Sequence, residues 1–351
     1  MIHLAEIITM RSGEELDKQK LAVFLRDALN IPTDDLIIRQ FSAGASNLTY
    51  LLQVNGQEYV LRRPPLGPLA PKAHDMEREY NILKALEGQM ASIPHVFVFT
   101  KDESILGSPF FIMERKKGVT IEFEFPKSVD YTPQLGRKLS EMMIDTLVDL
   151  HAIDYEKTAI VNLVKPTGFL ERQVHSWIKR YKRVENEQIE GIDELVAWLV
   201  SNLPSEQQST IIHYDFKFNN MMFSEDFSQL VGLFDWEMTT VGDPLADVGV
   251  ALSYWVRPTD SEEIQNLFGK QSLTLLDGFY SRQQMIARYA EKSGRDLTNI
   301  NYYMAFAYFK LAVIALQIYD RYKKGQTEDQ RFAYYGKLGG VAIRAAIKQM
   351  A

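Results

Sequence analysis

The sequence predicts an α+β protein made of two parts, a small antiparallel sheet followed by a larger, mainly helical region. Between residues 36 and 100, short apolar runs alternate with turn signals, and Asn55-Gly56 is the strongest short signal for a hairpin. From about residue 121 onward, the apolar residues follow helical periodicity instead. The length of 351 residues allows about two domains, which fits this division.

The composition is that of an ordinary soluble globular protein, with 46% hydrophobic and 24% charged residues. Cysteine is absent, which excludes a disulfide framework and thiolate chemistry. The net charge of -7 argues against a nucleic-acid partner, because such partners normally need a basic face. No apolar run approaches the ~20 residues needed to span a bilayer, and the first residues do not resemble a signal leader. We therefore expect a cytoplasmic protein without a membrane partner.

The first hundred residues are expected to form a helix and then a sheet. Apolar spacing predicts an amphipathic helix over Ser12–Leu29, with Ser12 as its N-cap. The strands and the second helix are expected at Ile37–Phe41, Leu48–Val54, Glu58–Arg62, Asp75–Leu86 (helix), Val96–Phe99 and Phe110–Met113. Small residues form the turn between the first two strands, and such turns let backbone N–H groups approach phosphates closely. The turn contains Ser42, Gly44, Ser46 and Asn47.

A basic residue, Arg62, ends the third predicted strand, and the helix that follows carries two candidate ion-pair partners. Arginine is always charged and can fork between a phosphate and a carboxylate. Glu79 is the expected partner, and Glu77 is the alternative. Further along, the strand that ends at Met113 passes into the charged, glycine-ended stretch 114–118, which indicates a boundary between the two parts.

The second part is expected to be built from long helices. They are predicted at Leu135–His151, Gln173–Tyr181, Ile192–Leu203, Asp247–Trp255 and Tyr302–Tyr322. In the last helix, Lys310, Gln317 and Arg321 are spaced by seven and four residues, which places them on one stripe. We expect this stripe to face solvent, with the lining of a substrate cleft as the alternative.

The strongest functional signal is His213-Tyr214-Asp215 followed by Asn220, with Asp235 at the end of a later apolar run. The flanking apolar runs predict short buried strands, which place Asp215 and Asn220 on a loop and Asp235 just past a hairpin. This arrangement suits phosphoryl transfer, which needs a carboxylate to orient the acceptor hydroxyl and two oxygen ligands for Mg²⁺. A lone H-x-D carries no information, but the combination at this spacing is much harder to obtain by chance.

These residues resemble the catalytic loop of the aminoglycoside phosphotransferase family, the small-molecule branch of the kinase-like fold. The resemblance covers about residues 36 to 345. At Arg62-Arg63-Pro64-Pro65, Arg172-Gln173 and Phe309 to Arg321 it is strongest to the kinase-like domains associated with acyl-CoA dehydrogenases. It implies a bilobal protein-kinase-like fold, with a nucleotide-binding lobe and leading helix over 1–113, a hinge over 114–120, and a helical lobe with the catalytic loop and acceptor site over 121–351.

The resemblance also implies a role for each site residue. Asp215 would orient the acceptor hydroxyl and take its proton, while Asn220 and Asp235 would hold Mg²⁺. Arg62, held by Glu79, would grip the phosphates of ATP. The remaining nucleotide contacts would come from the turn residues Ser42, Gly44, Ser46 and Asn47, from Met113 behind the adenine, and from the backbone at Glu114 and Lys116. His213, Asp247 and His151 would be structural.

Two positions depart from the family pattern. Arg62 stands where a lysine is usual, and Tyr214 stands where small-molecule relatives have glycine, which would narrow the acceptor entrance. Only a short loop separates Asp235 from Asp247, so the long activation segment that a protein kinase needs is absent. A nucleotide-binding pseudokinase with a regulatory role is an alternative, for which Arg62 is the best argument.

The expected function is therefore the ATP- and Mg²⁺-dependent transfer of the γ-phosphoryl group to a hydroxyl of a small molecule. A hydroxyacyl compound is the first hypothesis for the acceptor, and an aminoglycoside-type antibiotic is the alternative. Four cations, at Lys217, Arg257, Lys310 and Arg321, would repel a polycationic antibiotic if they converged on one cleft. The sequence leaves open ATP against GTP and the oligomeric state.

Overall fold

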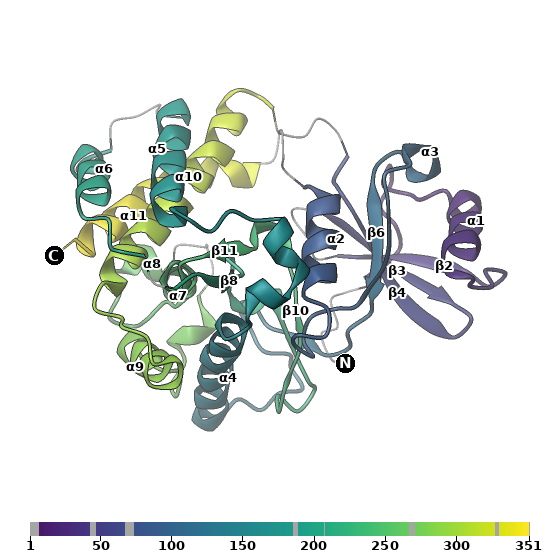
Figure 1. Ribbon diagram of the computed structural model, residues 1–351, viewed down its shortest axis with the longest axis horizontal. Helices are drawn as coiled ribbons and strands as arrows, with labels where there is room; N and C mark the ends of the chain where they lie inside the picture. Colours follow the sequence, from purple (N-terminus) through teal and green to yellow (C-terminus); the bar gives the residue numbers. More distant parts are fainter. Residues whose placement is uncertain are drawn as a thin grey trace.

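The computed structural model describes residues 7–42, 47–66, 74–184, 189–206, 208–266, 271–326 and 330–350. Gly44 and Ser46 of the predicted turn lie outside the described residues. Figure 1 shows a lobe built on a sheet at one end of the molecule and a helical lobe at the other, with α2 (Met76–Ala85) next to the sheet on the side of the helical lobe. The predicted α+β class and division into two lobes are confirmed.

The described part of the N-terminal lobe contains a six-stranded antiparallel sheet with the order β1-β2-β3-β4-β6-β5. Its strands are β1 (Ile7–Ile8), β2 (Ile37–Phe41), β3 (Leu48–Val54), β4 (Gln57–Arg63), β5 (Val96–Thr100) and β6 (Phe110–Glu114). Strands β3 and β4 pair without a break from Val54 and Gln57 to Leu48 and Arg63. Asn55 and Gly56 both have positive φ angles, as the tight hairpin turn requires. This hairpin places Arg62 at the far end of β4.

The two faces of this sheet belong to different hydrophobic cores, because side chains alternate along each strand. Tyr50 and Leu61 point toward α1 (Lys18–Leu29), which buries Leu21 and Leu25 on the outer face together with the short α3 (Glu103–Leu106). Leu51, Val60 and Phe111 belong to the larger core shared with α2 and the helical lobe. The inner face of the sheet is therefore the face that lies toward the helical lobe.

The first helix begins six residues later than predicted. Its N-cap is Asp17, whose carboxylate accepts hydrogen bonds from the backbone of Gln19 and Lys20. The predicted cap, Ser12, is followed by Gly13 at a φ of +85°, a conformation that cannot continue into a helix. The aspartate is the cap because its side chain satisfies two backbone donors of the first turn.

The helical lobe carries most of the remaining helices. They are α4 (Pro133–His151), α5 (Phe169–Val184), α6 (Ile192–Ser201), α7 (Pro244–Tyr254), α8 (Glu262–Gln265), α9 (Arg282–Ser293), α10 (Ile300–Lys323) and α11 (Tyr335–Lys348). Two small antiparallel sheets lie among them, β10-β9-β7 and β11-β8. Their strands are β7 (Val119–Thr120), β8 (Thr210–Ile212), β9 (Met221–Phe223), β10 (Leu230–Leu233) and β11 (Thr240–Gly242).

Helix α10 is the central helix of this lobe and packs against α5, α7 and α11. By length and composition alone it could cross a bilayer, contrary to our expectation, but 67% of its most apolar window is buried within the fold. Helix α7 lies very close to α10 at Gly249, where an added Cβ would lie 2.7 Å from the backbone of Tyr303. Lys310 of α10 is only 6% exposed, so the prediction that its stripe faces solvent is wrong at this residue.

Candidate active site

The predicted catalytic loop connects β8 to β9 on the side of the helical lobe that faces the sheet. His213 follows β8 directly and is fully buried. Its Nδ1 accepts a hydrogen bond from the backbone of Asp215 at 3.3 Å, so Nε2 is the atom that donates to the carbonyl of Phe234 at 2.9 Å. The histidine thereby ties the loop to the residue before Asp235, which is a structural role.

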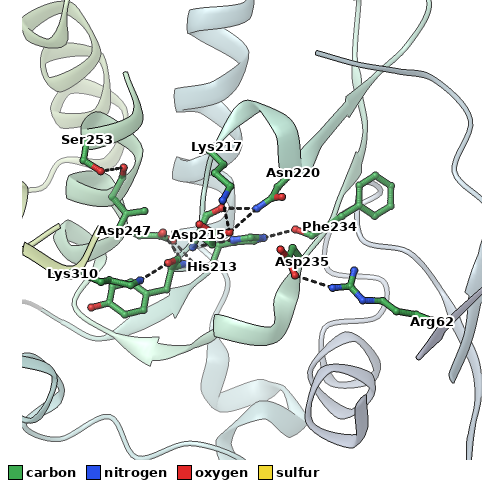
Figure 2. A network of polar contacts seen from close by, with 12 residues as sticks. Arg62, His213, Asp215, Lys217, Asn220, Phe234, Asp235, Asp247, Ser253 and Lys310 are labelled. Atoms are coloured by element: carbon green, nitrogen blue, oxygen red, sulfur yellow. Dashed lines mark hydrogen bonds and ion pairs between the residues drawn. The ribbon is translucent and has the colours of Figure 1, made fainter. Parts of the chain in front are cut away.

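Asp247, at the start of α7, fixes the same loop from below. Its carboxylate is fully buried and accepts from the backbone N–H groups of His213 at 2.6 Å and Tyr214 at 2.9 Å. His151 of α4 adds a contact to it at 3.3 Å. Burial opposes ionisation, but the bonds from His151 and the loop backbone hold the pKa of Asp247 below its ordinary value. Figure 2 shows Asp247 beside Asp215, on the side away from Arg62.

Asp215 itself lies at the centre of a small polar cluster. One carboxylate oxygen accepts a hydrogen bond from the amide nitrogen of Asn220 at 3.0 Å and forms an ion pair with the ammonium of Lys217 at 2.9 Å. Asn220 also donates to the backbone carbonyl of Asp215 at 2.8 Å. Burial works against the charge of Lys217, but Tyr254 and Asp215 hold its pKa above its ordinary value. Sequence reasoning missed this ion pair, although the spacing of two residues on one loop was its available signal.

Arg62 reaches from the sheet to the second predicted metal ligand. Its guanidinium lies 3.1 Å from Glu79 of α2 and 2.9 Å from Asp235, as Figure 2 shows for the second contact. Glu77, the alternative partner, instead pairs with Lys101 at 2.8 Å. Burial raises the pKa of Glu79 to about 7 against the opposing effect of Arg62. A chain of three charged groups, of which Glu79 is buried, thus joins the two lobes.

A cleft of about 530 Å³ opens between the sheet and the catalytic loop. It is lined by Arg62 and Asp235, by Asn220, and by many of the residues expected to contact nucleotide, among them Asn47, Met113, Glu114 and Lys116. The backbone N–H of Glu114 donates to the carbonyl of His95, so only the carbonyl of Glu114 is left to accept a hydrogen bond from adenine. Ser42 lies at the end of β2, where its carbonyl accepts from Arg11.

A second pocket of about 360 Å³ adjoins the first at Glu122, Lys217 and Asn219, which line both. Most of its wall is apolar and comes from α7, α10 and α11. Its apolar lining residues are Phe123, Met143, Phe218, Ala251, Tyr254, Trp255, Leu311, Ile314, Ala315, Ile318 and Leu338. The two pockets meet at the catalytic loop, as a donor site and an acceptor site must.

The structure corrects two sequence-based expectations about this entrance. Tyr214 does not narrow it, because its side chain is 2% exposed and packs against Phe169 beneath the loop. The four cations do not converge on one cleft either. Lys310 donates to the carbonyl of Tyr214, and Arg257 donates to the carbonyl of Thr274. Neither of these two residues nor Arg321 lines either pocket, whereas Lys217 lines both.

The residues present fit a magnesium ion. Asn220 uses its amide nitrogen on Asp215, so its amide oxygen is the end that can ligate a cation. Asp235 bonds Arg62 through Oδ1, which leaves Oδ2 as a second oxygen on the same cleft wall. Carboxylate and amide oxygens are the ligands that Mg²⁺ prefers.

The fold and the site together are those of a two-lobed, kinase-like phosphotransferase. Residues 37–279 match the model of the phosphotransferase enzyme family, and the chain belongs to that family. The chain is 32% identical over 331 residues to mouse acyl-CoA dehydrogenase family member 10, covering 94% of this chain but only 31% of the mouse protein. It therefore spans about a third of that relative.

Solved structures agree on the fold. A Ralstonia eutropha protein provisionally called an aminoglycoside phosphotransferase is 26% identical, with a TM-score of 0.79 over 95% of this chain and 99% of its own. An ethanolamine kinase of Plasmodium vivax is 14% identical, with a TM-score of 0.63 over 92% of this chain and 86% of its own, which is a likeness of fold alone. The predicted family and kinase-like fold are confirmed.

Proposed function

We propose that this protein transfers the γ-phosphoryl group of ATP, with Mg²⁺, to a hydroxyl group of a small molecule. The proposal is supported by the arrangement of Arg62, Asn220 and Asp235 around one cleft, with Asn220 bonded at 3.0 Å to the carboxylate of Asp215 on the catalytic loop. Phosphoryl transfer requires little more than positioning and charge stabilisation, which this arrangement can supply. We propose a cytoplasmic location, and neither a nucleic-acid nor a membrane partner.

The N-terminal lobe and the stretch after it supply the contacts to the nucleotide, and the helical lobe supplies the ligands of the metal. Arg62, fixed by Glu79, grips the phosphates from the sheet side, while Met113 and the backbone at Glu114 and Lys116 receive the adenine. The oxygens of Asn220 and Asp235 would hold Mg²⁺, which neutralises charge on the phosphates.

The chemical step takes place at Asp215, whose carboxylate lies on the loop between the two pockets. The hydroxyl oxygen of the acceptor bonds to the γ-phosphorus while Asp215 takes the hydroxyl proton. The bond between the γ-phosphorus and the oxygen bridging to the β-phosphorus breaks at the same time, which releases ADP. Lys217, which lines both pockets, places a positive charge where the phosphoryl group passes.

The second pocket supports an acceptor with an apolar body. Its wall is formed by aliphatic and aromatic side chains, such as Trp255, Leu311 and Ile314, which favour burial of hydrocarbon rather than of a polycation. We therefore propose a hydroxylated acyl chain, free or as its CoA thioester, as the acceptor.

A coupled ADP-release assay against hydroxyacyl-CoAs, hydroxy acids, aminoglycosides and choline tests both parts. Ile318→Trp, which fills the second pocket, should raise the KM of the acceptor at least about 10-fold and leave that of ATP within about 2-fold. Val200→Trp on the exposed side of α6 is the matched control. Turnover of aminoglycosides with none of hydroxyacyl compounds would overturn the acceptor.

A nucleotide-binding pseudokinase is the second candidate, because Arg62 forms an ion pair with Asp235, one of the two residues proposed to hold Mg²⁺. This candidate predicts nucleotide binding without ADP release, either with any acceptor in the panel or with water. Sustained acceptor-dependent ADP release excludes it.

A further inference from the structure

Tyr214, the residue immediately before Asp215, lies in an unusual backbone conformation. Its φ is +66°, in the left-handed region that residues with a Cβ rarely adopt. The conformation determines the direction in which the chain enters Asp215, so something must hold it there. The N–H of Tyr214 is held by Asp247 at 2.9 Å, which fixes one side of the residue.

Lys310 of α10 fixes the other side. Its ammonium donates to the backbone carbonyl of Tyr214 at 2.8 Å, and the same nitrogen lies 3.4 Å from the centre of the Tyr214 ring. The ring of Trp177 on α5 lies 5.9 Å from this nitrogen. Figure 2 shows Lys310 on the side of the loop away from Arg62. The lysine thus contacts both the carbonyl and the side chain of the strained residue.

We propose that Lys310 is a positioning residue, which holds Tyr214 in its left-handed conformation and thereby sets the position of Asp215 for phosphoryl transfer. This inference rests on the proposed function, but it concerns a residue that lies outside both pockets. A charged side chain is buried here only at a cost, so a specific contact is needed to explain its place.

The electrostatic surroundings agree with a buried hydrogen-bond donor. Asp215 and Asp247 favour the charge of Lys310, Lys217 and Arg180 oppose it, and burial, the largest effect, lowers its pKa to about 7. An amine has an N–H to donate in either protonation state. The bond to Tyr214 therefore persists across the pH range in which the pKa lies.

The test is a comparison of Lys310→Met in two backgrounds. In the wild-type background we expect kcat to fall about 10- to 100-fold with the KM of ATP within about 2-fold, because the carbonyl loses its donor while the contacts of Arg62 remain. In a Tyr214→Gly background the same change should cost less than about 3-fold, since glycine adopts this conformation freely. Lys182→Met, which removes an exposed lysine of α5, is the matched control and should leave kcat unchanged.

Hydrogen exchange of the peptide that spans residues 213–220 gives a readout independent of turnover. Exchange should be faster in Lys310→Met than in wild type or Lys182→Met. If no acceptor is phosphorylated by wild type, the proposed function fails while this measurement still decides the positioning role. If Lys310→Met does not fold, Lys310→Gln, whose amide can still donate, should give an intermediate kcat. Equal losses in both backgrounds, or unchanged exchange, overturn the inference.

Discussion

Replacing Arg62 with alanine should change metal binding and nucleotide binding in opposite directions. In the structure the guanidinium of Arg62 lies 2.9 Å from Asp235, so it holds one oxygen of the proposed metal ligand. Removing it frees that oxygen and should strengthen the binding of Mg²⁺ alone. The same change removes the cation that grips the phosphates, so the affinity for the Mg²⁺–nucleotide complex should fall.

The sizes of these effects follow from the two contacts. A hydrogen bond to a charged group contributes about 1.5–3 kcal/mol, which corresponds to a loss of roughly 10- to 150-fold in nucleotide affinity. Glu79 is 1% exposed and would lose its partner. Removing one member of a buried ion pair typically costs about 3–5 kcal/mol of folding free energy.

The loss of stability should also depend on pH. Burial already raises the pKa of Glu79 to about 7 in the presence of Arg62, and without Arg62 it rises further. A carboxyl whose pKa is raised by folding binds more protons in the folded state, so stability falls as pH rises from its unfolded value of 4.5 through 7. The deficit of the alanine variant relative to wild type should therefore be larger at pH 8 than at pH 5.

Calorimetric titration of Mg²⁺, with and without a non-hydrolysable ATP analogue, measures the first effect, and denaturant unfolding at both pH values measures the second. Arg62→Lys keeps the charge but cannot fork between two carboxylates, so it should recover part of each loss. Arg39→Ala, at an exposed position of β2, is the control. Unchanged nucleotide affinity, together with a loss of stability that is the same at both pH values, would exclude both roles of Arg62.

Three further predictions follow from the same contacts. Asp215→Asn should lower kcat by ~10³-fold or more while nucleotide still binds, because proton removal is lost and the phosphate contacts are not; near-normal kcat would show that another residue is the base. Asp235→Ala should abolish the Mg²⁺ dependence of nucleotide binding, and a titration in which mutant and wild type respond equally to Mg²⁺ would rule the role out. Burial lowers the pKa of Lys310 from 10.5 to about 7, so the unfolded chain binds more protons between these values. The stability of wild type relative to Lys310→Met should therefore rise between pH 7 and pH 9 in denaturant unfolding, by up to about 1.4 kcal/mol per pH unit.

Local sequence patterns predicted the parts of the fold that local interactions determine. The Asn55-Gly56 hairpin formed as expected because both residues tolerate positive φ angles. The first helix was predicted to begin too early, at Ser12, because the positive φ of Gly13, which excludes that cap, cannot be read from the sequence.

The parts that were missed depend on contacts distant in sequence. Glu77 and Glu79 lie on different faces of α2, and only the position of the sheet decides which one meets Arg62. Lys310 was expected on a solvent-facing stripe of α10, but it bonds a carbonyl 96 residues away in the chain. The burial of Tyr214 could not be predicted from the sequence either. A tyrosine in place of glycine shows that a side chain has been added, but not whether it points into the entrance or into the core.

The stoichiometry of phosphate transfer decides whether this protein phosphorylates an acceptor hydroxyl. Purified protein is incubated with ATP, Mg²⁺ and a hydroxyacyl-CoA, and ADP and phosphorylated acceptor are both quantified over time, with Asp215→Asn as the parallel sample. We expect one phosphorylated acceptor for each ADP in the wild type, and neither product above background in the variant. ADP that forms without phosphorylated acceptor, or equally in both samples, would contradict this expectation.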